Sequence, residues 1–210
     1  MTKETIAERK NDHLDIVLDP RRACSAVDPG YAALTFEHCA VPELRLDDID
    51  IRAVLFGRPL SAPLLISSMT GGAARATQIN RNLAEAAEVL GIALAVGSQR
   101  IALETDADQG LTRQLRELAP SIPLLANFGA AQLVAGYGLD EAQRAVDMIQ
   151  ADALIIHLNP LQEAVQVGGD RNWIGVYAAL EALALRLPVP LIAKEVGAGI
   201  SPSVAQRLLR

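Results

Sequence analysis

Ala153-Leu-Ile-Ile-His-Leu-Asn-Pro-Leu-Gln-Glu163 is the stretch that decides how this chain folds and where its site lies. Its apolar part, residues 153–156, has the length and the branched side chains of a buried parallel strand. Polar residues then crowd the C-terminal end of the strand as far as Arg171, although a structural strand-to-helix loop needs only a turn residue and a helix cap. Ligands of parallel α/β proteins usually bind at such loops. We therefore expect a binding site at this strand end.

Comparable strand candidates recur along the chain at intervals of about thirty residues, the length of one strand–helix unit. They begin near Leu64, Ile92, Ile122, Ala153 and Val189. Strands that alternate with helices predict a parallel sheet with right-handed crossovers. This pattern alone leaves two architectures open, an open doubly wound sheet and a (β/α)8 barrel.

Helical patterns fill the intervals between these strands. A helix that ends at Gly91 is predicted to bury Ile79, Leu83, Ala86, Ala87 and Leu90. A helix over residues 139–149 is predicted to bury Ala142, Ala145, Val146 and Ile149. A third helix is expected over residues 173–187, and Ser201-Pro202 has the cap and first-turn residues of a fourth.

Residues 1–60 do not follow the repeat. We expect a helix over residues 1–20 that stops at Pro20, and short strands at 34–37 and 50–55 that form a lid or hairpin over one end of the fold. The chain therefore divides into an N-terminal helix and lid or hairpin segment, residues 1–60, and a strand–helix part, residues 61–210, within a single domain overall.

Charge and composition exclude several functions. The net charge of −6 and the pI near 5.1 argue against nucleic acid and anionic membranes as partners. No apolar run has the length of a membrane-spanning helix, and the charged N-terminus is not a secretory signal. Cys24 and Cys39 lack metal-ligand spacing and are expected to be reduced thiols, as in a cytoplasmic protein.

All five strands are followed by groups that form hydrogen bonds. The segments are Ser67-Ser-Met-Thr-Gly-Gly72, Gly97-Ser-Gln-Arg100, Ala126-Asn-Phe-Gly129, His157 with Gln162-Glu163, and Lys194-Glu195. In a closed barrel these segments would meet at one mouth. A packed core would not select polar residues at the same strand end five times, so their joint occurrence predicts a site.

The residue types indicate which ligands would bind at this mouth. Burying Lys194 is costly unless it meets an anion or an electron-rich ring. The neutral groups of Ser68, Thr70, Ser98 and Asn127 suit the edge of a large planar heterocycle. These side chains therefore favour a bound ring system over a row of phosphates.

Charged residues supply candidates for phosphate and metal binding. Arg9, Lys10 and Arg100 are suited to phosphate, and Glu163 is the candidate ligand for Mg²⁺, which usually takes one or two carboxylates plus phosphate oxygens. The chain's three histidines lack zinc-ligand spacing. Taken without other information, however, the basic segment around Arg9 is more typical of a solvated charged face.

Seven sequence blocks together resemble one family. They are Arg9-Lys-Asn-Asp-His-Leu14, Ser68-Met-Thr-Gly-Gly72, Val96-Gly-Ser-Gln-Arg100, Ala126-Asn-Phe-Gly129, His157-Leu-Asn-Pro-Leu-Gln-Glu163, Gly169-Asp-Arg171 and Lys194-Glu-Val-Gly197. In order and spacing they resemble type 2 isopentenyl-diphosphate isomerase, an FMN-dependent (β/α)8 barrel. The resemblance covers nearly the whole chain and implies that residues 61–210 form about the first five βα units of such a barrel.

The resemblance also implies roles for individual residues. Flavin contacts are expected from Ser68, Met69, Thr70, Ser98, Asn127 and Lys194. Contacts with the substrate, a prenyl diphosphate, are expected from Arg9, Lys10, Ser98, Gln99, Arg100 and Gln162. Glu163 is expected to bind Mg²⁺, while His13 and His157, with Gln162, support the substrate.

The reaction that the resemblance implies moves a double bond between isopentenyl and dimethylallyl diphosphate. Reduced FMN is the expected acid–base group, because no protein side chain is placed for both proton transfers, and NADPH is the expected reductant. The resemblance further implies a homo-oligomer for the full-length enzyme.

The sequence leaves two other interpretations open. Another FMN barrel, such as a 2-hydroxy-acid oxidase or a dihydroorotate dehydrogenase, also ends a strand with a flavin-facing lysine, but it leaves Gln162-Glu163 and the basic N-terminal segment unexplained. A half-barrel without catalytic activity is the second, if the C-terminus at residue 210 is native. Family members continue past this point with three more strands, which carry the glycine-rich loops that bind the FMN phosphate. The sequence is therefore expected to be truncated.

We accordingly expect residues 1–210 alone to bind FMN weakly or not at all, because the phosphate-gripping loops of the family lie beyond them. Flavin absorbance after gel filtration of the isolated chain measures this. Tight, stoichiometric retention of FMN would contradict the expectation.

Overall fold

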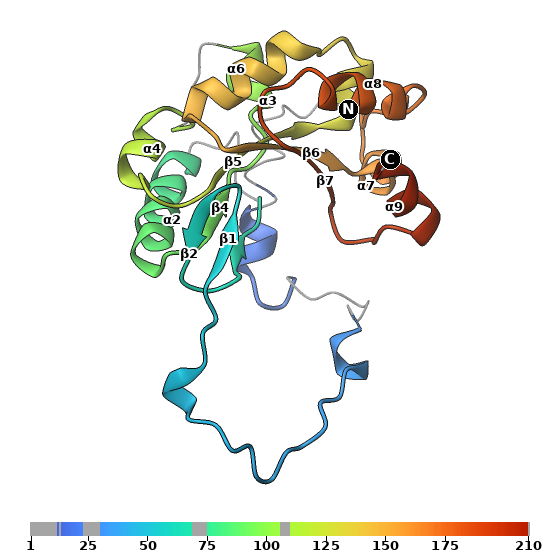
Figure 1. Ribbon diagram of the computed structural model, residues 1–210. Helices are drawn as coiled ribbons and strands as arrows, with labels where there is room; N and C mark the ends of the chain where they lie inside the picture. Colours follow the sequence, from blue (N-terminus) through green and yellow to red (C-terminus); the bar gives the residue numbers. More distant parts are fainter. Residues whose placement is uncertain (1–11, 13, 23–29, 69–74, 106–109, 210) are drawn as a thin grey trace.

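The fold is built on a five-stranded parallel sheet that curves as half of a barrel. The computed structural model describes residues 12, 14–22, 30–68, 75–105 and 110–209. The strands lie side by side in chain order as β3 (Leu65–Ile66), β4 (Ala93–Ala95), β5 (Leu124–Gly129), β6 (Ala153–Leu158) and β7 (Leu191–Glu195). Each starts within a few residues of its predicted position, and the parallel half-barrel confirms the predicted fold class (Figure 1).

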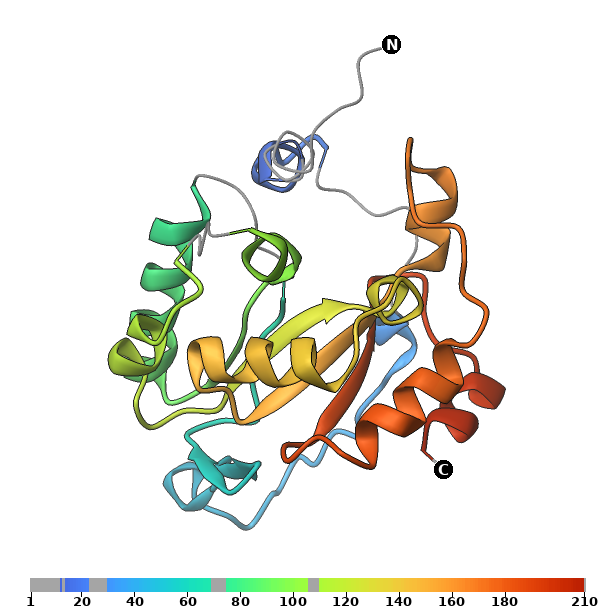
Figure 2. The ribbon, with the colours of Figure 1, turned by 90° about the horizontal axis from the view of Figure 1, so that it is seen from above.

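Helices cover the outside of this sheet, where Figure 2 shows α2, α6 and α8 following its curve. The helices are α2 (Ala76–Leu90), α3 (Arg100–Glu104), α4 (Gln114–Leu118), α5 (Ala130–Val134), α6 (Leu139–Ile149), α7 (Pro160–Val165), α8 (Val176–Ala184) and α9 (Pro202–Leu208). Strand side chains alternate between two clusters, as the period of a β-strand requires. Leu124, Ala126 and Phe128 pack toward the helices, whereas Leu125 packs on the inner face.

The predicted helix faces are correct for α6 and partly wrong for α2. In α6 the buried residues are the four that the sequence indicated. In α2 the buried residues are Ala76, Asn80, Ala84 and Ala87, whereas Ala86 is exposed and Leu90 is 59% exposed. The stripe of mainly small residues packs against β4 and α4, so close packing decided the face over side-chain hydrophobicity. Gly91 ends α2 in the left-handed conformation as predicted.

The last two predicted helices differ in their agreement with the structure. The helix expected over residues 173–187 is shorter than predicted and begins at Val176. Gly175, just before it, has a φ of 91°, a left-handed conformation that does not continue a helix. Ser201 caps α9 as expected, its hydroxyl accepting a hydrogen bond from the backbone N–H of Val204 at 3.4 Å.

The N-terminal segment contributes one hairpin to the half-barrel. Strands β1 (Ala53–Leu55) and β2 (Arg58–Leu60) pair antiparallel through Phe56 and Gly57, which both have positive φ, as a type I′ turn requires. Leu60 packs with Leu125 and Ile155, so the hairpin covers the inner face of the sheet.

The expected strand at residues 34–37 is absent, and the one expected over 50–55 is confirmed only for 53–55. Two short 3-10 helices, Tyr31–Ala33 and Leu46–Asp48, interrupt a long loop that extends away from the sheet (Figure 1). Residues 14–18 are helical and stop before Pro20 as predicted, while most of the expected N-terminal helix lies outside the described residues.

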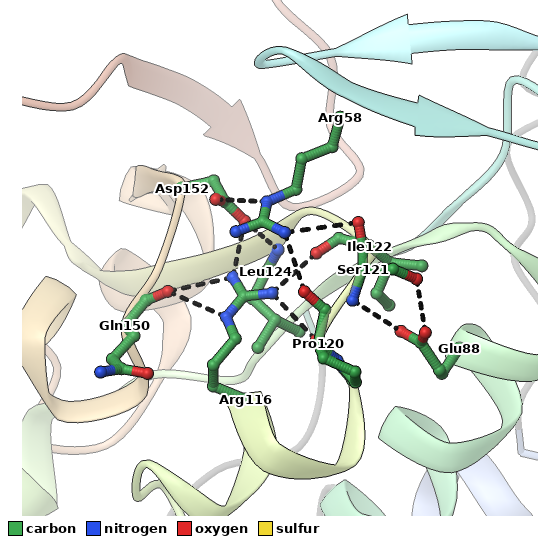
Figure 3. A network of polar contacts seen from close by, with 10 residues as sticks. Arg58, Glu88, Arg116, Pro120, Ser121, Ile122, Leu124, Gln150 and Asp152 are labelled. Atoms are coloured by element: carbon green, nitrogen blue, oxygen red, sulfur yellow. Dashed lines mark hydrogen bonds and ion pairs between the residues drawn. The ribbon is translucent and has the colours of Figure 1, made fainter.

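Asp152 joins the hairpin to the N-terminal end of the sheet (Figure 3). One carboxylate oxygen accepts from Arg58 Nε at 2.6 Å, and the other accepts from Arg116 of α4 at 2.7 Å and from the Leu124 N–H at 2.9 Å. Arg116 also donates to the carbonyl oxygens of Gln150 and Ile122. The side chains of Asp152 and Arg116 are only 16% and 11% exposed, so this is a largely desolvated ion-pair network.

We predict that Asp152→Asn destabilises the fold by roughly 3 kcal/mol, because removing one partner of a buried ion pair leaves the arginines without their counter-charge. Urea unfolding measures the change in free energy. Asp50→Asn is the control, because its pair with Arg52 is exposed on both sides and should bring no comparable loss. Equal losses in the two variants would contradict a structural role for the Asp152 network.

Candidate functional site

A cleft of about 670 Å³ lies where the C-terminal ends of the five parallel strands meet. Eight of the residues predicted from the sequence line it: Ser68, Ser98, Arg100, Asn127, His157, Gln162, Glu163 and Lys194. They come from all five strand ends, because parallel pairing places every C-terminal end at the same edge. The convergence expected from the sequence is therefore present in the structure.

Five other predicted site residues, Arg9, Lys10, His13, Met69 and Thr70, lie outside the described residues. Gln99 is described but does not line the cleft. It is fully buried, its Oε1 accepts from the Asn127 N–H at 2.8 Å, and its Nε2 donates to the carbonyl oxygen of Ala145 at 2.9 Å. The side chain thus fastens the end of β4 to β5 and α6, which does not match the substrate contact expected of it.

Asn127 and His157 form a polar pair in the wall of the cleft. The register that places Gly129 opposite His157 brings the His157 Nδ1 to 2.8 Å from the Asn127 Oδ1. A Cβ at position 129 would lie 2.7 Å from the His157 Nε2, so the imidazole needs glycine at this point. Backbone register and the hydrogen bond to Asn127 orient the ring, and Gly129 leaves room for it.

Lys194 enters the cleft from the last strand, opposite His157 in the register. Its Nζ lies 3.5 Å from the carbonyl oxygen of Glu195, at the limit of a hydrogen bond. The Glu195 carboxylate instead accepts from the N–H groups of Gly197 and Gly199, at 2.6 and 2.9 Å. Burial lowers the pKa of Lys194, and the charge of Glu195 only partly offsets this effect. The ammonium group is therefore suited to an electron-rich or anionic ligand.

Glu163 projects into the cleft from α7. Its Oε1 accepts from the Asn159 amide at 2.8 Å, and its Oε2 accepts from the Asp170 N–H at 2.7 Å. Within the described ranges, no group of three His, Cys, Asp or Glu residues could hold a metal ion. One carboxylate with nearby amide oxygens fits Mg²⁺, which keeps waters and takes phosphate oxygens from its ligand.

Arg100 lies at the start of α3 between two carboxylates. Its Nε donates to Glu104 at 3.0 Å, and its Nη1 donates to Asp170 at 3.2 Å. Burial opposes the charge, but the hydrogen bond to Glu104 and the charges of both carboxylates outweigh it and raise the pKa of Arg100. The guanidinium is consequently a permanent positive charge at the cleft wall.

Several cleft residues were not predicted from the sequence. Gln132 follows β5 and accepts from the Gly129 N–H at 3.1 Å, and its position just past a strand end was a signal that could have found it. Asn159 lies in the polar segment that indicated a site in the sequence but had no assigned role, and its amide donates to Glu163. Ile16 and Val17 gave no signal, because only tertiary packing brings their helix over the cleft.

Ser68 has a property that bears on ligand binding. Its Oγ is buried, lines the cleft region, and has no hydrogen-bond partner among the described residues. Buried polar groups are normally paired, so an orphan at a cleft wall indicates a place for a ligand atom.

The chain is similar along its whole length to curated proteins. It is 71% identical over 209 residues to isopentenyl-diphosphate delta-isomerase of Stutzerimonas stutzeri, 61% identical to that of Pseudescherichia vulneris, and 46% identical to that of Deinococcus radiodurans. These alignments cover 99–100% of this chain but 60–61% of each relative, so the chain spans about 60% of their length. The homology confirms the resemblance found in the motifs.

No protein-family model matches the chain. A mandelate oxidase mutant with a monooxide FMN adduct superposes with a TM-score of 0.49 at 13% identity, covering 78% of this chain and 48% of the oxidase, which is too weak to bear on function. In the part of the chain that the structure describes, no helix has the length and apolarity to cross a membrane.

The ionisation of Tyr137, near the cleft wall, should make the stability of the protein depend on pH. The Tyr137 hydroxyl donates to Glu104 at 3.0 Å, and burial, followed by this hydrogen bond, raises its pKa from 10.0 to about 12. Because the folded state holds the proton more tightly, the stability that it contributes is complete below pH 10.0 and is lost as pH rises through about 12. The absorbance titration of the native protein minus that of Tyr137→Phe should show a midpoint near 12. A midpoint near 10.0 would contradict the buried geometry.

Proposed function

We propose that this chain, homologous throughout to isopentenyl-diphosphate delta-isomerases, contributes the substrate and flavin cleft of an enzyme that interconverts isopentenyl and dimethylallyl diphosphate. One observation carries the proposal. Arg100 and Glu163, which suit a metal-bound diphosphate, share one cleft with Asn127 and Lys194, which suit the edge of a ring.

The cleft residues fit a flavin ring. Ser68 offers a buried hydroxyl without a partner in the described chain, and Asn127 and Lys194 offer an amide and an ammonium group from β5 and β7, the two strands that flank β6. When bound, reduced FMN supplies the group that gives and takes protons, with NADPH as its reductant. Lys194 would stabilise negative charge on the ring, and its burial makes that interaction stronger than in water.

The charges in the cleft support a role for Mg²⁺. Among the described lining residues, Arg100 and Lys194 are cationic, and Glu163 and Glu195 are anionic. A diphosphate therefore needs additional positive charge to bind here. Glu163 would hold Mg²⁺ against the diphosphate, while Arg9 and Lys10 would supply further charge, as the family resemblance implies.

The remaining residues would orient the hydrocarbon part of the substrate. Ile16, Val17 and Ile101 give the cleft an apolar wall that would accommodate a prenyl chain and shield it from water. Excluding water protects an electron-poor carbon from hydration. His157, oriented by Asn127, and Gln162 would position the substrate, and His13 would support it from the N-terminal segment.

The proposal is tested with the native gene product loaded with FMN. Absorbance before and after dithionite or NADPH establishes whether a flavin is bound and reduced. We expect isopentenyl diphosphate to be converted to dimethylallyl diphosphate only when reduced flavin and Mg²⁺ are both present. Oxidation of a 2-hydroxy acid without any isomerisation would overturn the proposal and favour the oxidoreductase alternative.

Glu163→Gln tests the metal assignment separately. Removing a residue that hydrogen-bonds a metal ligand already lowers metal affinity roughly 10–100-fold. Replacing the ligand itself should therefore raise the Mg²⁺ concentration for half-maximal activity by at least roughly tenfold. Glu85→Gln, on the exposed side of α2, is the matched control and should leave the Mg²⁺ dependence unchanged. The metal assignment is wrong if the two variants respond alike to Mg²⁺.

A further inference from the structure

We propose that Asp170 is a positioning residue that holds Arg100 and Glu163 in the relative placement needed to bind one metal–diphosphate group. This inference rests on the proposed function and adds a residue to it. Arg100 belongs to the unit after β4, and Glu163 belongs to the unit after β6. Asp170 contacts both, and so joins two parts of the cleft that the chain separates.

The two contacts use different parts of Asp170. Its side-chain Oδ2 accepts from the Arg100 Nη1 at 3.2 Å and from the Gln132 Nε2 at 3.4 Å. Its backbone N–H donates to the Glu163 Oε2 at 2.7 Å. A single residue thus sets the direction of the guanidinium through its carboxylate and the direction of the metal-directed carboxylate through its backbone.

The backbone of Asp170 is itself fixed by its neighbours. A Cβ on Gly169 would lie 2.1 Å from the carbonyl oxygen of Glu163, so the segment lies directly against α7 and only glycine fits there. On the other side, the Trp173 indole N–H donates to the Asp170 carbonyl oxygen at 3.1 Å. These contacts fix the backbone from which the carboxylate reaches Arg100 before any ligand arrives, which lowers the entropy lost when Arg100 is fixed by an anion.

Positioning and simple electrostatics predict opposite effects of removing the Asp170 charge. Taking a negative charge away from an anion site strengthens binding if the charge acts only by repulsion. If the carboxylate aims Arg100, its removal weakens binding, because the guanidinium loses its pre-set direction. The sign of the change therefore separates the two roles.

Glu104 provides the matched comparison within the chain. It also accepts from Arg100, at 3.0 Å, and from the Tyr137 hydroxyl, but it belongs to α3 and not to the segment that packs on α7. Glu104→Gln thus removes a carboxylate from Arg100 without touching the segment that packs on α7. If joining the two units matters, this variant should lose less affinity than Asp170→Asn.

The experiment measures calorimetric binding of inorganic pyrophosphate with Mg²⁺ to the FMN-loaded native gene product. We expect Asp170→Asn to weaken binding roughly tenfold, because a neutral amide oxygen holds the Arg100 guanidinium less strongly than a carboxylate does. In an Arg100→Gln background the same substitution should add no further loss. For the isomerisation, KM should rise more than kcat falls, because the diphosphate lies away from the reacting carbons.

Asp170→Glu keeps the charge but moves it by one methylene, so it should also weaken binding, and thermal unfolding checks that each variant is folded. Unchanged or tighter pyrophosphate binding by the Asp170 variants overturns the inference, as does a loss that persists without Arg100 or an equal loss in Glu104→Gln. These results would leave the proposed function intact. A native protein that neither binds pyrophosphate nor isomerises the substrate would overturn both.

Discussion

Parallel hydrogen bonding between neighbouring strands is the constraint on which the rest of this structure depends. It forces every strand to present its C-terminal end at the same edge, so residues far apart in the chain meet there. The register that pairs Gly129 with His157 and His157 with Lys194 sets three consecutive strand ends at one level. The cleft is a direct consequence of this register, because buried apolar residues fill the sheet below it.

The two ends of the sheet serve different purposes. At the N-terminal end, Asp152, Arg58 and Arg116 form a network in which the charged groups bond to one another and to backbone oxygens (Figure 3). That network fastens the hairpin and leaves little polar capacity for a ligand. At the C-terminal end, Ser68 lacks a partner in the described chain and Lys194 is partly buried next to a carbonyl oxygen. The Ser68 hydroxyl and the half-buried Lys194 ammonium group therefore give the C-terminal end a capacity to bind a ligand.

The charged residues in and around the cleft come from helices, a strand and a loop. Arg100 follows β4, whereas Glu163 and Asp170 follow β6, and their hydrogen bonds join these two units of the half-barrel across the one between them. Gly169 allows this because its missing side chain lets one loop lie against α7. A loop held from both sides can keep charged groups in a fixed relative placement, which is what recognition of a compact anion requires.

The sequence by itself determined the strand–helix repeat, the edge at which polar residues gather, and the buried side of α6, because these follow from local periodicity and composition. Tertiary structure alone decided that Gln99 turns into the protein, that α2 buries its small residues rather than Leu90, and that Asp170 reaches Arg100. The physical reason is that periodicity records which residues prefer to be buried. The direction of a particular side chain depends on its partners, which come from segments far away in the sequence. A local sequence pattern does not say how close those segments come in the folded protein.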